Sequence, residues 1–106
     1  MKHTFNFGTA IELIKQGRLV ARENWNGKNM FVFMHPAITL RESFIAKTYT
    51  IFPEAYKEWI KNNPSESGEV TFSSHFCLKT PDGTVVNGWL ASQTDMQADD
   101  WYEVVV

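Results

Sequence analysis

The chain has 106 residues and a hydrophobic content of 43%, which is enough for one domain with a single core. Its formal net charge is −2 and its ten lysines and arginines are dispersed, which excludes binding to duplex nucleic acid through a basic stripe. Cys77 is the only cysteine, so an internal disulfide is excluded, and no apolar run is long enough to span a membrane. We therefore expect a single cytoplasmic domain over residues 1–106.

An N-terminal helix is indicated by four apolar residues that are spaced as one helix face: Phe7, Ala10, Ile11 and Ile14. Asn6 or Thr4 is suited to cap the first turn of this helix. Gly17 is suited to end it, because glycine adopts the left-handed conformation without a steric penalty.

Two strands are predicted after this helix, at residues 18–22 and 30–34, with an Asn-Gly turn at residues 23–29 between them. Residues 36–50 have no clean period and give no assignment. A second, short helix is indicated further on, with Pro53 in its first turn. Its predicted apolar face consists of Phe52, Tyr56, Trp59 and Ile60.

The C-terminal part predicts the rest of a sheet. Residues 70–79 alternate between apolar and polar side chains, as a half-buried strand does, and a Thr-Pro-Asp-Gly turn returns the chain antiparallel at residues 84–86. Residues 91–100 predict a loop with one helical turn, and residues 101–106 predict a last strand. The expected fold class is α+β: a small antiparallel sheet of four to five strands, with one main N-terminal helix packed on it and a short second helix.

The usual arrangements of catalytic and metal-binding residues are missing from this sequence. The three histidines are far apart and no Cys-x-x-Cys pair exists, which disfavours a zinc site. Cys77 lies in an alternating strand without a nearby basic residue, which favours a small apolar role over a nucleophile. No glycine-rich phosphate loop is present. We therefore expect no catalytic residue, no metal, no cofactor and no enzymatic activity.

Recognition of a ligand is the chemistry that these residues favour. Trp25 and Trp89 each lie beside an asparagine and a glycine, where an indole can stack on a nucleotide base or, alternatively, belong to the core. Arg22 and Lys28 flank Trp25 and can pair with a phosphate. The same cations can also be ordinary solvated charges.

Hydrogen-bonding side chains for a ribose or a base edge are abundant in the same two regions: Asn26, Asn87, Ser92, Gln93 and Thr94. Turn and cap chemistry is the alternative role for all of them. Asp95 and Asp99 can accept hydrogen bonds from ribose hydroxyls, but they repel a phosphate. A bound phosphate is therefore expected nearer to Arg22 and Lys28 than to the acidic loop.

The two ends of the chain resemble a known protein family. Residues 5–33 (FNFGTAIELIKQGRLVARENWNGKNMFVF) and residues 82–105 (DGTVVNGWLASQTDMQADDWYEVV) are similar to the second type of Thoeris anti-defence protein, a phage-encoded sponge for nucleotide immune signals. The two blocks cover about half of the chain, and their WNGK and GWLASQTDM…DW strings are specific.

The resemblance implies a function in binding without turnover. Proteins of this family hold a cyclic ADP-ribose isomer (a glycocyclic ADP-ribose) made by the bacterial Thoeris defence, so that its effector is not activated. The resemblance also implies a homo-oligomer, typically a tetramer, with ligand pockets between subunits. Some relatives hold cyclic dinucleotides at a separate site. The implied location is the cytoplasm of an infected bacterial host or a prophage-bearing cell.

The resemblance also implies a set of ligand-binding residues: Trp25, Asn26, Trp89, Ser92, Gln93, Thr94 and Asp95, with Arg22, Lys28 and Met30 as further candidates. Trp101 closes the family motif, but we expect it in the core. Residues 36–69 do not match the family's usual short connection, and Gln97 stands where an apolar residue is expected.

Two other functions are compatible with the sequence. The first is a phosphodiesterase of ADP-ribose-type signals, in which Asp95, Asp99 and Asp100 hold Mg²⁺. The second is a protein-interaction module whose exposed tryptophans contact another protein.

Overall fold

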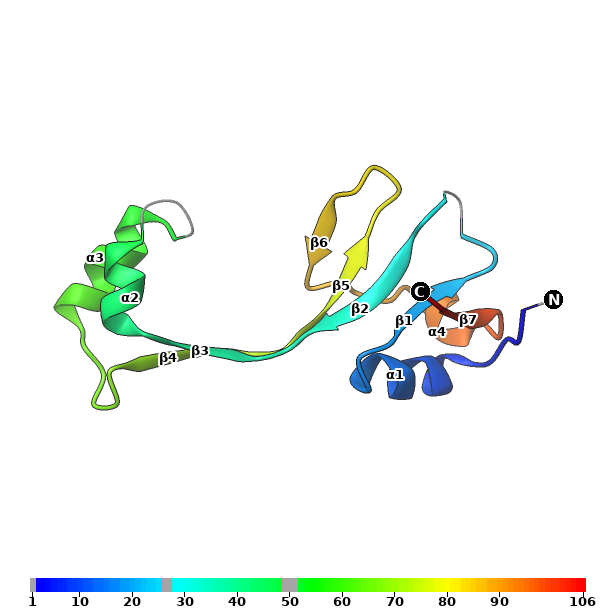
Figure 1. Ribbon diagram of the computed structural model, residues 1–106, viewed down its shortest axis with the longest axis horizontal. Coiled ribbons are helices and arrows are strands. Elements are labelled where there is room, and N and C mark those ends of the chain that lie inside the picture. The colour runs from blue at the N-terminus through cyan, green and yellow to red at the C-terminus, as the bar shows by residue number, and fades with distance from the viewer. Residues whose placement is uncertain (1, 26–27, 49–51) are drawn as a thin grey trace. The chain divides into compact units, whose positions relative to one another are not determined.

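The computed structural model describes residues 2–25, 28–48 and 52–106, and these form two compact units (Figure 1). The first unit combines the chain up to Pro36 with the chain from Ser74 onward, and the second unit is Ala37–Ser73. That the whole chain is one domain stays a prediction.

The first unit is a five-stranded antiparallel sheet with two helices, which confirms the predicted α+β class. Its elements are α1 (Phe7–Lys15), β1 (Leu19–Arg22), β2 (Phe31–His35), β5 (His75–Lys79), β6 (Val85–Asn87), α4 (Gln93–Gln97) and β7 (Trp101–Val104). The strand order is β6-β5-β2-β1-β7. β1, from residues 5–33, and β7, from residues 82–105, are therefore neighbours in the sheet.

The predicted N-terminal helix is confirmed, together with both of its end signals. The Asn6 side chain accepts a hydrogen bond from the Thr9 backbone N–H at 2.9 Å, and Gly17 has a φ of 87°. α1 packs against β1, β2 and β7 and lies beside α4 (Figure 1). Its inward face buries Ala10 and Ile14 completely, because these two positions lie one turn apart on the helix.

The core of the first unit lies between α1 and the sheet. Val20 of β1, Val32 of β2 and Trp101 of β7 are fully buried there, as are the inward residues of α1. The expectation that Trp101 is a core residue is therefore confirmed. Burying a side chain of this size contributes about 1.5–3 kcal/mol or more, which makes Trp101 a principal source of stability.

The second unit contains two strands and two helices. Its elements are β3 (Ile38–Arg41), α2 (Glu42–Lys47), α3 (Glu54–Asn62) and β4 (Glu69–Phe72), with β3 and β4 paired antiparallel. The predicted second helix corresponds to α3, but β3 and α2 were not predicted, because their region has no clean period. One detail was wrong: Trp59 is 59% exposed and lies outside the apolar face on which Ile60 is buried.

The strand predicted at residues 70–79 is in fact two strands. β4 ends at Phe72 and pairs with β3, whereas β5 begins at His75 and pairs with β2. β5 pairs with β2, and Pro36, which directly follows β2, has no backbone N–H to donate to a longer ladder. The alternating pattern continues through this break, which is why the sequence alone did not indicate it.

The C-terminal segments follow the prediction closely. The Gly83 backbone N–H donates to Thr80 O at 3.1 Å, and β6 returns antiparallel along β5. The single helical turn expected in residues 91–100 is α4, and the last strand is β7. None of the helices in the described parts of the chain combines the length and apolarity needed to cross a membrane.

Candidate functional site

A cavity of about 450 Å³ opens where β1 and β2 separate. All four residues of β1 pair with β7, whereas among the described residues β1 pairs with β2 where Val20 faces Val32. Had that register continued, Arg22 would face Met30 across the ladder. Instead the chain leaves β1 after Arg22, and the space between the two strands becomes a pocket.

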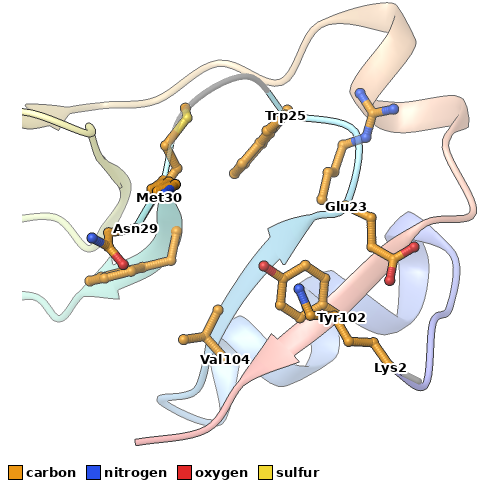
Figure 2. Close-up of a pocket in the computed structure, with 10 residues that line it drawn as sticks. Lys2, Glu23, Trp25, Asn29, Met30, Tyr102 and Val104 are labelled. Carbon is orange, nitrogen blue, oxygen red and sulfur yellow. The ribbon is translucent and has the colours of Figure 1, made fainter.

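Side chains from four segments line this cavity: Lys2, Arg22, Glu23, Trp25, Lys28, Asn29, Met30, Phe31, Tyr102 and Val104. Figure 2 shows Trp25 on one side of the hollow and Tyr102 and Val104, from β7, on another. Asn29 and Met30, which directly precede β2, lie on a further side (Figure 2). The wall thus combines aromatic faces, aliphatic side chains and a few charges, as small-molecule sites usually do.

Four aromatic rings from both ends of the chain form a cluster behind this wall. The Trp25 indole meets Trp101 edge to face at 5.2 Å between ring centroids, and Trp89 at 6.4 Å. Phe7 completes the cluster, with centroid distances of 5.4 Å to Trp101 and 6.4 Å to Trp89. Because Trp25 is only partly buried, one part of its ring supports the core while the rest belongs to the cavity.

Arg22 is held by two carboxylates. Its Nε donates to Asp100 Oδ1 at 2.8 Å, and its Nη1 donates to Asp95 Oδ1 at 2.9 Å, with only 9% of the Arg22 side chain exposed. The hydrogen bond to Asp100 is the main reason that the pKa of Arg22 is raised. The guanidinium charge is therefore offset by two anions, and the expected pairing of Arg22 with a ligand phosphate loses support.

The same contacts keep both carboxylates ionised. Burial alone would raise the pKa of Asp95, but hydrogen bonds from Arg22, Trp25 and the Ser92 backbone outweigh it, so the pKa is lowered. Asp100 behaves alike: burial opposes ionisation, yet donation by Arg22 and by the Asn24 backbone N–H lowers its pKa. Three charged groups thus form one internal network beside the cavity.

Free positive charge at the cavity comes from lysines. Lys2 Nζ lies 3.9 Å from the centroid of the Tyr102 ring, a cation–π distance that holds the ammonium at the cavity wall. Lys28 lines the cavity and is exposed. Lys79 adds a third ammonium close by, since its Nζ donates to Asn29 O at 2.8 Å.

The structure brings four of the predicted site residues together in the cavity: Arg22, Trp25, Lys28 and Met30. It places the others outside that wall: Trp89, Ser92, Gln93, Thr94 and Asp95. Asn26 lies outside the described residues. Ser92 caps α4, Gln93 and Thr94 are exposed in its first turn, and Trp89 belongs to the aromatic cluster.

Several residues of the cavity were not predicted, among them Lys2, Tyr102 and Val104. Strand alternation contains the signal for the last two, because β7 places Trp101 in the core and therefore turns the next residue, Tyr102, to the opposite face. Lys2 gives no such signal, since its position depends on the cation–π contact with Tyr102.

Other candidate reactive groups are also engaged. Asp95 and Asp100, two of the three carboxylates considered as Mg²⁺ ligands, bind Arg22, and the described residues contain no group of three or more potential metal ligands. Cys77 is fully buried and its Sγ donates to Asn87 Oδ1 at 3.4 Å. It fits the predicted role of a small core side chain.

The chain is similar in sequence to known proteins. Residues 5–104 match the family model of the Thoeris anti-defense 2-like domain. The chain belongs to this family. It is also 36% identical over 101 residues to the protein named Thoeris anti-defense 2 of Bacillus phage SP01, with 95% of this chain and 96% of that protein covered.

Membership in the Thoeris anti-defense 2-like family supports a role against bacterial Thoeris defence. The match corrects one expectation. Because the aligned region covers nearly the whole of both proteins, residues 36–69 have a counterpart in the phage SP01 relative and do not set this chain apart from it.

Proposed function

We propose that this protein binds and sequesters cyclic ADP-ribose-type signalling nucleotides, including glycocyclic ADP-ribose isomers, without cleaving them. The observation that carries the proposal is the cavity between β1 and β2, which joins an indole, a phenol ring and two lysines. Its volume of about 450 Å³ is within the roughly 300–1,000 Å³ typical of small-molecule sites. The family's anti-defence role supports a target in immune signalling.

The chemistry of the wall suits a nucleotide. Trp25 and Tyr102 offer aromatic faces for a base, and stacking on such a face contributes about 1–3 kcal/mol per base. Lys2 and Lys28 offer ammonium groups for the pyrophosphate, while Arg22 holds the wall through its two carboxylates. This division of roles replaces the earlier one, in which Arg22 was expected to bind phosphate.

Reversible binding without turnover is supported by the internal contacts of Asp95 and Asp100, two of the three carboxylates considered as Mg²⁺ ligands. Asp95 and Asp100 accept hydrogen bonds from Arg22 and from backbone or indole N–H groups, so their oxygens are not directed at a ligand in the cavity.

We further propose a homo-oligomer, with a tetramer as the state typical of the family. Nanomolar binding requires about 12 kcal/mol, which is more than two stacking contacts supply, so a second subunit is needed to enclose the ligand. Apolar side chains available for such contacts include Val85 and Val86 on β6, which is an edge of the sheet, and Leu90, which is 89% exposed. Multi-angle light scattering will report the mass, and a monomer would contradict this part.

The decisive experiment combines binding with recovery. Isothermal titration with a panel of cyclic ADP-ribose isomers and cyclic dinucleotides should show tight binding of at least one ADP-ribose isomer. Heat denaturation of the complex, followed by mass spectrometry of the supernatant, should return the intact cyclic nucleotide. Recovery of a linear product, with its loss in the presence of a chelator, would instead identify a metal-dependent phosphodiesterase.

A protein-interaction function has one observation in its favour. Trp59 and Phe44, both in the second unit, are 59% and 49% exposed. Large exposed aromatic side chains are frequent in protein interfaces. Thermal stabilisation by a partner protein, but by none of the cyclic nucleotides, would favour this alternative over sequestration.

A further inference from the structure

Asp95 uses all of its polar atoms within the protein. Its Oδ1 accepts from Arg22 Nη1 at 2.9 Å and from Trp25 Nε1 at 3.1 Å. Its Oδ2 accepts from the Ser92 backbone N–H at 3.2 Å, and its backbone N–H donates to Ser92 Oγ at 3.0 Å. Only 9% of this residue is exposed, so it is a buried junction and not a group that faces a ligand.

The backbone of Asp95 accepts a second indole. Trp101 Nε1 donates to the Asp95 carbonyl oxygen at 2.9 Å. One residue therefore holds two tryptophans, Trp25 through its carboxylate and Trp101 through its main chain. Because Trp101 is fully buried in the core, the two bonds tie the loop that carries Trp25 to a core residue.

The neighbouring carboxylate secures the same loop one residue earlier. Asp100 Oδ2 accepts from the Asn24 backbone N–H at 3.0 Å, while its Oδ1 accepts from Arg22. Together with Asp95, it fixes the chain directly after β1. The hydrogen bond from Trp25 Nε1 to Asp95 in turn restricts rotation of the indole ring.

We infer that Asp95 is a positioning residue, which holds the Trp25 indole in the orientation that makes it part of the cavity wall. It acts on nucleotide binding through that ring and does not contact the nucleotide. This inference rests on the proposed function for its effect on affinity, although the effect on the indole itself does not depend on any ligand.

Hydrogen exchange tests the inference without a ligand. In ¹⁵N-labelled protein, the Trp25 indole signal is assigned by its loss in Trp25→Phe. In Asp95→Ala this indole N–H should exchange at least about tenfold faster, because alanine has no side-chain oxygen to accept from Trp25 Nε1. The Trp101 indole N–H, which donates to a backbone oxygen, should stay protected. Asp99→Ala is the matched control, since it makes the same change at an exposed position of the same segment. Unchanged exchange at Trp25 in Asp95→Ala would overturn the inference.

Affinity provides the second test. Asp95→Ala and Trp25→Phe should each weaken nucleotide binding about tenfold, and the double variant should bind no more weakly than the single variant with the lower affinity. Effects that multiply in the double variant would show that Asp95 acts separately from Trp25 and would overturn the inference. Should Asp95→Ala fail to fold, Trp25→Phe still tests the bond, because it retains Asp95, Arg22 and Ser92. Unaltered affinity in this variant would also overturn the inference. Failure of the wild type to bind any cyclic nucleotide would instead reject the proposed function and leave the exchange result standing.

Discussion

Trp25 and Trp89 meet edge to face, with ring centroids 6.4 Å apart, although they come from opposite ends of the sequence. Their contact joins the two blocks that resemble the family. The two indoles nevertheless lie in different surroundings: Trp25 lines the cavity, whereas Trp89 packs on Phe7 and Trp101 behind it. The two rings therefore differ in position although their local sequences are alike.

Alanine substitution should separate these two tryptophans. Trp25→Ala should lower nucleotide affinity by about tenfold or more, because a stacking face is lost. Trp89→Ala should lower the free energy of unfolding by about 2–4 kcal/mol, because a ring packed on the core leaves a cavity. Urea denaturation and calorimetric titration, both run below the unfolding temperature, measure the two effects. A larger loss of affinity in Trp89→Ala than in Trp25→Ala would place the ligand elsewhere.

The sequence was a good guide wherever one segment determines its own structure. The spacing in α1, the Asn6 cap, the glycine at position 17 and the turn at Gly83 depend on neighbouring residues and were predicted. β3 and α2 were missed because they are four and six residues long and have no clean period.

The site was harder to predict because it depends on pairing between distant segments. Arg22, Asp95 and Asp100 each looked like a ligand-binding group when considered alone. Only the fold shows that they bind one another, since the side chains of Arg22 and Asp95 are 73 positions apart in sequence. The lining by Lys2 likewise depends on its contact with the distant Tyr102 ring, which no local pattern indicates.

Replacing Arg22 should test the charged network. Arg22→Lys should reduce the free energy of unfolding by about 1–3 kcal/mol, because one ammonium does not reproduce a planar group that donates to Asp95 and Asp100 from different nitrogens. Arg18→Lys is the matched control. Arg18 also pairs with a carboxylate, Glu103, at 2.8 Å, but its side chain is 53% exposed, so the change should stay within about 0.5 kcal/mol. Equal effects at the two positions would mean that the buried network contributes no more than a surface ion pair.

Stability should also fall in acid. The pKa values of Asp95 and Asp100 are lowered on folding, so the unfolded chain binds more protons than the folded one as the pH drops. The stabilisation is therefore fully present above the ordinary aspartate pKa of 3.8 and is lost as the pH falls through the lower folded values. Urea denaturation at pH 7, 5 and 3 should give similar midpoints at the first two and a lower midpoint at the third.

The control for this pH dependence is the variant that lacks one of the two groups. Asp100→Asn should lose less stability between pH 5 and pH 3 than the wild type does, because one carboxylate no longer titrates. Asp99→Asn, at an exposed position, should retain the wild-type profile. If Asp100→Asn loses as much stability as the wild type over this range, the acid sensitivity arises elsewhere in the chain.

The lysines of the cavity should determine how strongly binding depends on salt. Lys2→Gln and Lys28→Gln should each weaken binding of a cyclic ADP-ribose-type nucleotide about three- to tenfold at low ionic strength, because each removes an ammonium near the proposed pyrophosphate. The difference from the wild type should narrow at high salt, since screening weakens the lost attraction in any case. Lys15→Gln makes the same change of charge in the last turn of α1, outside the cavity lining, and should bind like the wild type. Calorimetric titration at two salt concentrations measures all four proteins. If Lys15→Gln weakens binding as much as the cavity variants, net charge and not the cavity governs the affinity. If neither cavity variant changes it, the phosphates do not lie beside these two lysines.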